Sequence, residues 1–154
     1  MIVKLLYKTL NVSRNFVFHI LSTKTFGARA LVVWNGQVLL IKHTYQKGWY
    51  TIGGAVERNE SPCEAVIREL AEEAGVIPTE KPILFSIYHK NYKKRDDYIA
   101  FYIIKKFDLE EASYSPEIAE KKWYDLNDLP PDITPSTLKR IEEFLGKRET
   151  SDQW

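Results

Sequence analysis

The sequence predicts a single α/β domain, and three observations support this prediction. With 154 residues, of which 44% are hydrophobic and 28% charged, the chain has the size and composition of one ordinary globular domain. Short β-prone segments come in pairs separated by turn residues, as in hairpins. Two further segments show the helical spacing of apolar residues, and each is preceded by a capping residue and a proline.

The first 25 residues are both basic and apolar. The apolar residues that share one helical face are Ile2, Leu5, Leu6 and Leu10. We therefore expect residues 1–25 to form an amphipathic helical segment that packs on the domain or on a second subunit of a homodimer. Charged residues interrupt the segment before it reaches the ~20 apolar residues of a membrane-spanning helix. Its basic face permits only loose contact with a membrane surface.

The first pair of strands is expected on either side of Asn35-Gly36. Residues 27–34 are rich in Val, Leu and Trp, and residues 37–42 return as the second strand. Asn-Gly supplies the left-handed conformations that a two-residue hairpin requires. The polar and aromatic residues 43–50 then lead to Gly53-Gly54, a pair that allows the backbone to approach a ligand closely.

The first helix lies between Gly54 and Val76. Ser61 and Glu64 form a capping box around Pro62, which suits the first helical position, so the helix is expected to begin there. Gly75 is the natural end, because a left-handed residue after the last turn costs glycine little. Apolar residues recur at three- and four-residue steps along one side. The acidic side consists of Glu69, Glu72 and Glu73.

These three glutamates repel one another. Like charges three or four residues apart on a helix cost roughly 0.2–0.5 kcal/mol per pair, so we expect a cation among them. Clustered carboxylate oxygens suit a hard divalent cation such as Mg²⁺ or Mn²⁺, which takes its remaining ligands from water and substrate phosphates. The helix alone leaves open the alternative of a solvated acidic face.

The same segment resembles the Nudix box, G-x5-E-x7-R-E-U-x-E-E-x-G-U, in which U is apolar. The chain matches this pattern at every defined position: Gly54, Glu60, Arg68, Glu69, Leu70, Glu72, Glu73, Gly75 and Val76. The resemblance to Nudix hydrolases implies an α/β/α sandwich with a central mixed β-sheet, formed by residues 26–147. It also implies a metal-dependent hydrolase that cleaves a pyrophosphate bond in a nucleoside diphosphate linked to another moiety.

By this resemblance, the predicted metal ligands are Gly53 through its carbonyl, Glu57, Glu69, Glu72, Glu73 and Glu117. One of these glutamates or another loop acid would be the general base. Arg68 is permanently protonated, so we expect it to hold a glutamate in position. Glu120 is the alternative to Glu117, and both Glu57 and Glu117 could instead be solvated loop acids.

The second half of the chain contains another hairpin and a closing helix. Residues 83–92 and 98–107 read as its two strands, and the second is apolar on both faces, which is typical of a central strand. A short strand follows at 119–125. The closing helix begins after Thr134, which repeats the pattern of a cap and a proline. Residues 148–154 are expected to form a frayed C-terminal tail.

The substrate is harder to predict. Trp49, Tyr50 and Tyr92 could stack a base, and Lys94 and Arg95 could bind phosphates, although such residues often serve in cores or as solvated charges. Diadenosine polyphosphate hydrolases tend to carry a tyrosine near the place of Tyr92, where ADP-ribose hydrolases tend to carry a proline. We therefore favour a dinucleoside polyphosphate. The alternatives are ADP-ribose or a nucleotide sugar, and a nucleoside triphosphate.

Charge and cysteine content narrow the classes of function. The net charge of +1 gives no argument for a stable nucleic-acid partner, so a nucleotide-derived small molecule is expected. The single cysteine, Cys63, cannot form an intrachain disulfide, which favours the cytoplasm. A nucleotide-binding regulatory protein would have been expected to lose box residues. An isoprenyl diphosphate isomerase stays open as an alternative, but that chemistry would want a nucleophile in the strand and loop upstream of the box, whereas Cys63 lies inside it.

Overall fold

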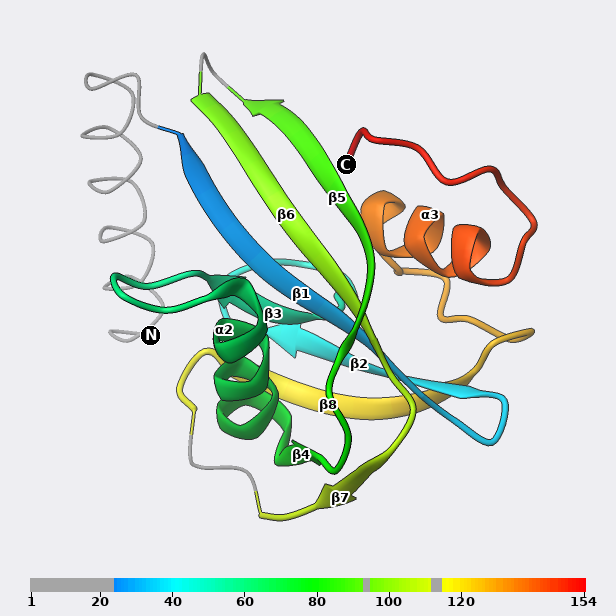
Figure 1. Ribbon diagram of the computed structural model, residues 1–154. Coiled ribbons are helices and arrows are strands. Elements are labelled where there is room, and N and C mark those ends of the chain that lie inside the picture. Colours follow the sequence, from blue (N-terminus) through cyan, green and yellow to red (C-terminus); the bar gives the residue numbers. More distant parts are fainter. Residues whose placement is uncertain (1–23, 93–94, 112–114) are drawn as a thin grey trace.

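The computed structural model describes residues 24–92, 95–111 and 115–154 (Figure 1). Its elements are β1 (Thr25–Trp34), β2 (Gln37–His43), β3 (Ile52–Ala55), α2 (Pro62–Glu69), η1 (Leu70–Ala74), β4 (Val76–Pro78), β5 (Ile83–Tyr92), β6 (Arg95–Ile104), β7 (Phe107–Leu109), β8 (Ile118–Asp125) and α3 (Pro135–Phe144). The predicted amphipathic segment lies outside the described residues, except for its last two. None of the described helices combines the length and hydropathy needed to cross a bilayer.

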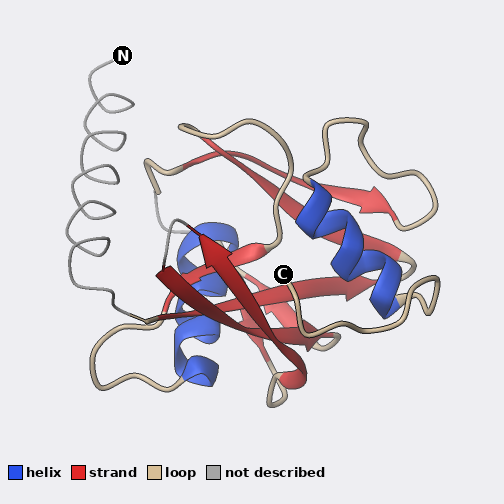
Figure 2. Cartoon of the chain, turned by 90° about the horizontal axis from the view of Figure 1, so that it is seen from above, coloured by secondary structure: helices blue, strands red, loops and turns tan. Residues whose placement is uncertain are grey.

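The main sheet has the strand order β5-β6-β1-β2-β8, and β3 pairs with β1 beside this path. It is mixed, because β1 runs parallel to β6 and antiparallel to β2 and β3. Figure 2 shows the two helices on opposite sides of the sheet. The predicted α/β sandwich with a mixed central sheet is therefore confirmed.

Alternation along the strands produces two hydrophobic cores. Ala28, Ala30 and Val32 of β1 face α2, where they pack with Val66 and Leu70. The intervening residues Leu31 and Val33 pack with Ile141 of α3 on the other side of the sheet. Because successive side chains of a strand point to opposite faces, the run of apolar residues in β1 serves both cores. This double burial keeps β1 in the centre of the sheet.

The first helix begins as its sequence predicts. Glu64 N–H donates to the Ser61 hydroxyl at 3.2 Å, and Ser61 N–H donates to the Glu64 carboxylate at 2.8 Å, which completes the capping box. The helix does not stay regular, however. Its last five residues form the π-helical turn η1, which ends at Gly75 with a φ of 68°. The wider turn changes the direction of the acidic side chains that follow Leu70.

Two other predicted boundaries are corrected. The strand expected at 98–107 covers Arg95–Ile104, and Phe107 begins the separate short strand β7, which pairs with β4. The tail expected to be frayed is bound instead. His89 N–H donates to the carbonyl of Asp152, and Trp154 N–H donates to the carbonyl of His89, so the tail pairs with the edge of β5.

The tail is held by a buried ionic cluster between α3 and β5. Arg140 is completely buried, and its Nη2 donates to Glu143 Oε1 at 2.7 Å. The hydroxyl of Tyr88 donates to the other carboxylate oxygen of Glu143 at 2.6 Å. The Arg140 guanidinium also lies 3.8 Å from the centre of the Tyr88 ring and 5.3 Å from that of Trp154. This cluster joins the last helix, the tail and the sheet.

We expect Arg140→Met to lower the free energy of unfolding by about 3–5 kcal/mol, because it leaves the buried Glu143 carboxylate without its partner. Urea unfolding followed by circular dichroism measures this change. Arg148→Met is the matched control, since Arg148 pairs with Glu142 on the surface and should contribute at most about 1 kcal/mol. Equal effects of the two substitutions would contradict a structural role for the cluster.

Candidate active site

Glu73 is the most buried of the predicted acidic ligands. Only 7% of its surface is exposed, and its Oε2 accepts a hydrogen bond of 2.9 Å from Gly53 N–H. Burial raises the pKa of Glu73 to about 7, and the nearby carboxylates of Glu69 and Glu117 act in the same direction. A carboxylate in this environment is stabilised by a proton or a cation beside it.

The two glycines of β3 make this arrangement possible. Gly53 has a φ of 135°, and a Cβ there would clash with the carbonyl oxygen of Ala28 on β1. A Cβ on Gly54 would lie 2.5 Å from Oε1 of Glu69. The helix carboxylates therefore approach the β3 backbone through space that any larger residue would fill. The lack of space for a Cβ is the physical reason why glycine begins the motif.

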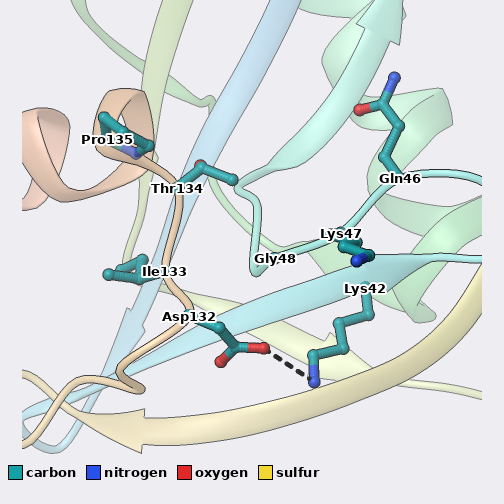
Figure 3. A pocket seen from close by; sticks show the side chains of 8 residues that line it. All are labelled: Lys42, Gln46, Lys47, Gly48, Asp132, Ile133, Thr134 and Pro135. Carbon is teal, nitrogen blue, oxygen red and sulfur yellow. Dashed lines mark ion pairs between the residues drawn. The ribbon is translucent and has the colours of Figure 1, made fainter.

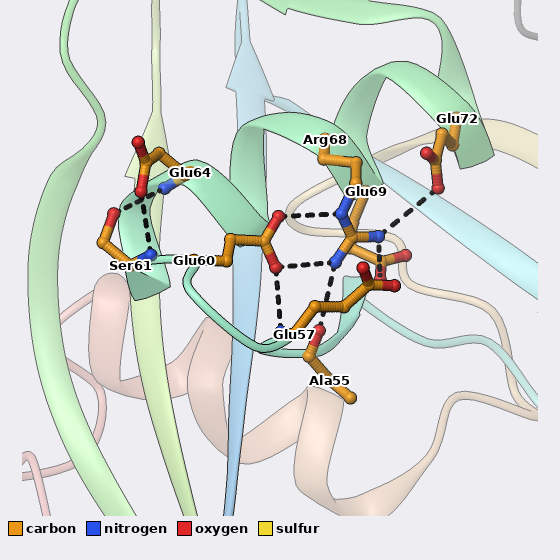
Figure 4. Close-up of polar contacts among 8 residues, drawn as sticks. All are labelled: Ala55, Glu57, Glu60, Ser61, Glu64, Arg68, Glu69 and Glu72. Carbon is orange, nitrogen blue, oxygen red and sulfur yellow. Dashed lines mark hydrogen bonds and ion pairs between the residues drawn. The ribbon is translucent and has the colours of Figure 1, made fainter.

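Arg68 links the loop before α2 to the acidic end of the helix (Figure 4). Its Nε and Nη2 donate to the two carboxylate oxygens of Glu60 at 2.8 and 3.0 Å. Its Nη1 donates to Glu69 at 2.8 Å, and its Nη2 also reaches the Ala55 carbonyl at 3.1 Å. The guanidinium holds the pKa of Glu60 down to about 2. Arg68 thus joins Glu60 to Glu69, and its service as a positioning residue stays a prediction.

The remaining box acids differ from Glu73 in exposure. The Glu72 side chain is 55% exposed and lies 3.4 Å from Arg68 Nη1. Glu57 is exposed in the loop, where its N–H donates to Glu60, and in Figure 4 its side chain extends toward Glu69. The three helix glutamates therefore do not share one solvated face, because Glu73 is buried and Glu72 is exposed.

Glu117 reaches the site from the loop before β8. Its backbone carbonyl accepts from Thr44 N–H at 2.8 Å, and its Oε2 accepts from the Tyr45 hydroxyl at 3.3 Å. It is close enough to Glu73 to raise the pKa of that residue. Glu120 instead belongs to β8 and pairs with Lys42 across the strands. The structure thus brings Glu117 to Glu73, and its service as a metal ligand stays a prediction.

Three further residues border the site and were not predicted. Arg29 of β1 donates to the carbonyl of Thr51 and lowers the pKa of Glu69 and Glu73 against the effect of burial. His43 is buried, its pKa is lowered to about 4 mainly by burial, and its Nδ1 has no hydrogen-bond partner among the described residues. Tyr45 stacks on His43. For Arg29 the sequence does contain a signal, because it is the lone charged residue in the apolar run 27–34.

The predicted substrate-binding residues are not gathered in one place. Trp49 is only 2% exposed and packs edge-on against Tyr124 in the α3-side core, so a base cannot stack on its ring. Tyr50 is half-buried with its ring 5.2 Å from His43, beside the acidic site. Arg95 pairs with Asp97 at the β5–β6 hairpin. Lys94 and the side chain of Tyr92 lie outside the described part of the structure.

The donor set fits a divalent cation that is completed by a substrate. Glu69, Glu73 and Glu117 offer carboxylate oxygens, the ligands that Mg²⁺ and Mn²⁺ prefer. Among the described residues, however, no three acidic, histidine or cysteine side chains already converge on one metal position. Mg²⁺ is commonly held by one or two carboxylates together with waters and substrate phosphates. The arrangement therefore requires small side-chain rotations or additional ligands.

A separate pocket of about 500 Å³ opens at the N-terminus of α3 (Figure 3). It is crossed by an ion pair of 3.1 Å between Lys42 and Asp132. Lys47, Gly48 and Thr134 also line it, and none of the predicted catalytic or metal-binding residues does. We assign no role to this pocket.

We expect Gly53→Ala to lower the free energy of unfolding by at least about 3 kcal/mol, because the new Cβ would strain the backbone and clash with β1. Gly146→Ala is the matched control. Gly146 also has a positive φ, of 69°, but no atom lies within 4 Å of its added Cβ, so only about 1–2 kcal/mol should be lost. If chemical denaturation showed that the two substitutions lower the free energy of unfolding by similar amounts, a clash with β1 would not be the main cause of the effect.

Comparisons with known proteins agree with this geometry. The family model of the NUDIX domain matches residues 24–144. An ADP-ribose pyrophosphatase of Methanocaldococcus jannaschii is 33% identical over 99 residues, which cover 62% of this chain and 59% of that protein. An 8-oxo-dGTP diphosphatase of Escherichia coli is 32% identical over 99 residues, which cover 58% of this chain and 72% of that protein.

The fold is also similar to solved structures. The crystal structure of a MutT NUDIX hydrolase from Burkholderia pseudomallei matches 78% of this chain and 97% of its own, with a TM-score of 0.69 and 26% identity. The alignment with the M. jannaschii relative spans about three fifths of that protein's length. Because the family model covers well over half of the residues, the chain belongs to the NUDIX domain family.

Proposed function

We propose that the protein is a divalent-metal-dependent pyrophosphohydrolase that cleaves a phosphoanhydride bond in a nucleoside diphosphate derivative. The observation that carries this proposal is the buried carboxylate of Glu73, fixed by Gly53 N–H beside Glu69 and Glu117. The pyrophosphatase and diphosphatase names of the relatives support the same type of reaction. Mg²⁺ or Mn²⁺ is the proposed cofactor, held by Glu69 and Glu73 with contributions from Glu57, Glu72, Glu117 and the Gly53 carbonyl.

The reaction adds water across a P–O–P linkage. A new bond forms between the water oxygen and phosphorus, the bridging P–O bond breaks, and the proton of the water passes to a carboxylate. A bound divalent cation would neutralise the pyrophosphate and favour deprotonation of the attacking water. Glu73 has one oxygen committed to Gly53 N–H, which leaves Oε1 to face a cation or a proton. Arg68 keeps Glu69 in place throughout.

A dinucleoside polyphosphate is the first candidate substrate, because the chain lacks the proline after the box that ADP-ribose hydrolases tend to carry. ADP-ribose is the second candidate, and the similarity to the M. jannaschii ADP-ribose pyrophosphatase favours it. Both compounds join a nucleoside to a phosphoanhydride, as does 8-oxo-dGTP. The acidic centre acts on this shared linkage, whereas the surrounding aromatic residues would select the base.

We expect Mg²⁺-dependent release of a nucleoside monophosphate from at least one member of a panel containing diadenosine tetraphosphate, ADP-ribose and 8-oxo-dGTP. Product formation is measured by chromatography. Glu73→Gln should lower kcat/KM for the best substrate by at least about 100-fold, because it removes the charge that serves the cation or the proton transfer.

Glu142→Gln is the matched control, since Glu142 pairs with Arg148 on the surface of α3, and its activity should stay within about twofold of wild type. Two results would overturn the proposal: hydrolysis that persists in excess EDTA, or a Glu73→Gln protein with normal turnover. Thermal unfolding of each variant separates a loss of chemistry from a loss of folding.

Arg68→Lys should lower kcat by about 10–100-fold and raise the Mg²⁺ concentration needed for half-maximal activity. Lysine keeps the charge but cannot bind Glu60 and Glu69 at once with a planar fork. Activity measured over a range of Mg²⁺ concentrations tests this. Arg148→Lys is the control. If Arg68→Lys lowered only the melting temperature and left the Mg²⁺ dependence unchanged, Arg68 would be structural and not a positioning residue.

A further inference from the structure

A second pocket, of about 550 Å³, lies at the end of β1 that is remote from the acidic site. Trp34 closes β1, six residues after Ala28, which pairs with Gly54. At a rise of ~3.3 Å per residue, these two positions are about 20 Å apart along the strand. The pocket shares no lining residue with the acidic site. We call it the aromatic pocket, and its lining includes Trp34, Thr79, Lys106, Phe107, Leu109 and Trp123, together with Lys105 and Asp108.

Three aromatic rings form the apolar part of the aromatic pocket. The Trp123 ring lies between the other two, 6.4 Å from Trp34 in an edge-on arrangement and 6.0 Å from Phe107 in a stacked one. Trp34 nevertheless keeps 55% of its surface exposed, and Leu109 keeps 59%. The folded chain thus leaves a large indole uncovered inside a concavity, which is the usual setting for stacking with a planar ligand.

The polar part of the aromatic pocket favours an anionic group on that ligand. Within the described part of the chain, Lys106 forms an ion pair only with Glu80, and both side chains are more than 60% exposed. Exposed pairs of this kind are weak, so a phosphate can replace Glu80 as the partner of Lys106. Asp108 also borders the pocket, but alternation along β7 directs it away from the face shared by Phe107 and Leu109.

We propose that the aromatic pocket is a second nucleotide-binding site, which takes a nucleoside monophosphate with its base against Trp34 and its phosphate near Lys106. The pocket volume is within the range of small-molecule sites, and the juxtaposition of free aromatic surface with a releasable lysine matches the two halves of a nucleotide. This site is separate from catalysis and does not depend on the identity of the substrate.

The four tryptophans allow a direct test by NMR. AMP is titrated into ¹⁵N-labelled protein in EDTA, which removes divalent cations from the acidic site. The indole N–H signals of Trp34 and Trp123 should shift and saturate in the millimolar range or below. Those of Trp49, which is buried, and Trp154, which packs on Tyr88, should stay in place and serve as internal references.

Two substitutions test the proposed contacts with the base and with the phosphate separately. Read from the Trp123 signal, Trp34→Ala should weaken AMP binding at least fivefold, because stacking contributes a large share of such affinities. Lys106→Ala should weaken AMP more than adenosine. The matched controls are Phe26→Ala, which removes an exposed aromatic ring outside the pocket, and Lys147→Ala, which removes an exposed lysine that follows α3 and does not line the pocket. Both controls should bind AMP as the wild type does.

Ligands that lack the base test which part of the nucleotide the pocket binds. Ribose 5-phosphate and inorganic phosphate should each bind at least fivefold more weakly than AMP. Equal binding of either, or an unchanged affinity in Trp34→Ala, would overturn the role of the base. An absence of Trp34 and Trp123 shifts up to saturating AMP would overturn the site itself. Failure of the hydrolase assays would leave these results unaffected, since no catalysis is measured.

Discussion

The close approach of the β3 backbone to the acidic end of the first helix is the constraint on which the site depends. Gly53 lies so near β1 that a side chain would clash there, and its N–H thereby faces Glu73. Gly54 leaves the space into which Glu69 extends. The helix can approach only because small and β-branched residues, Ala28 and Val66 among them, pack between it and the sheet. The packing of the helix on the sheet therefore also determines the geometry of the site.

Much of the fold could be predicted because its signals are local. The left-handed Asn35-Gly36 turn, the capping box at Ser61 and the double burial of β1 each depend on neighbouring residues. The end of β6, the β4–β7 pair and the bound tail could not be predicted in this way. Each depends on contacts with residues far along the chain, as when the tail satisfies backbone groups on the edge of β5.

The same distinction between local signals and distant contacts applies to the candidate active site. The box pattern identifies the residues that meet at the helix, and regular periodicity places all three glutamates on one acidic side. In the structure Glu73 is buried on the side of Val66 and Leu70, whereas Glu72 stays exposed. Trp49 is predicted to bind the substrate because a loop aromatic resembles a stacking residue, whereas the structure buries it in the core on the α3 side of the sheet. Sequence spacing indicates which residues can meet. It does not determine whether the ring of an aromatic residue is buried in one of the cores or stays free to bind a ligand.

The balance of charge supports the proposed need for a cation when a substrate arrives. Arg68 contacts Glu60, Glu69 and Glu72. Arg29 acts on Glu69 and Glu73, and Glu117 lies near Glu73. Arg68 is largely neutralised by its paired contacts with Glu60, so the remaining carboxylates keep an excess of negative charge. A pyrophosphate would add more negative charge to a region where burial already raises the pKa of Glu69 and Glu73. Added positive charge would reduce the repulsion between these carboxylates and a pyrophosphate, and hard divalent cations bind carboxylate and phosphate oxygens together.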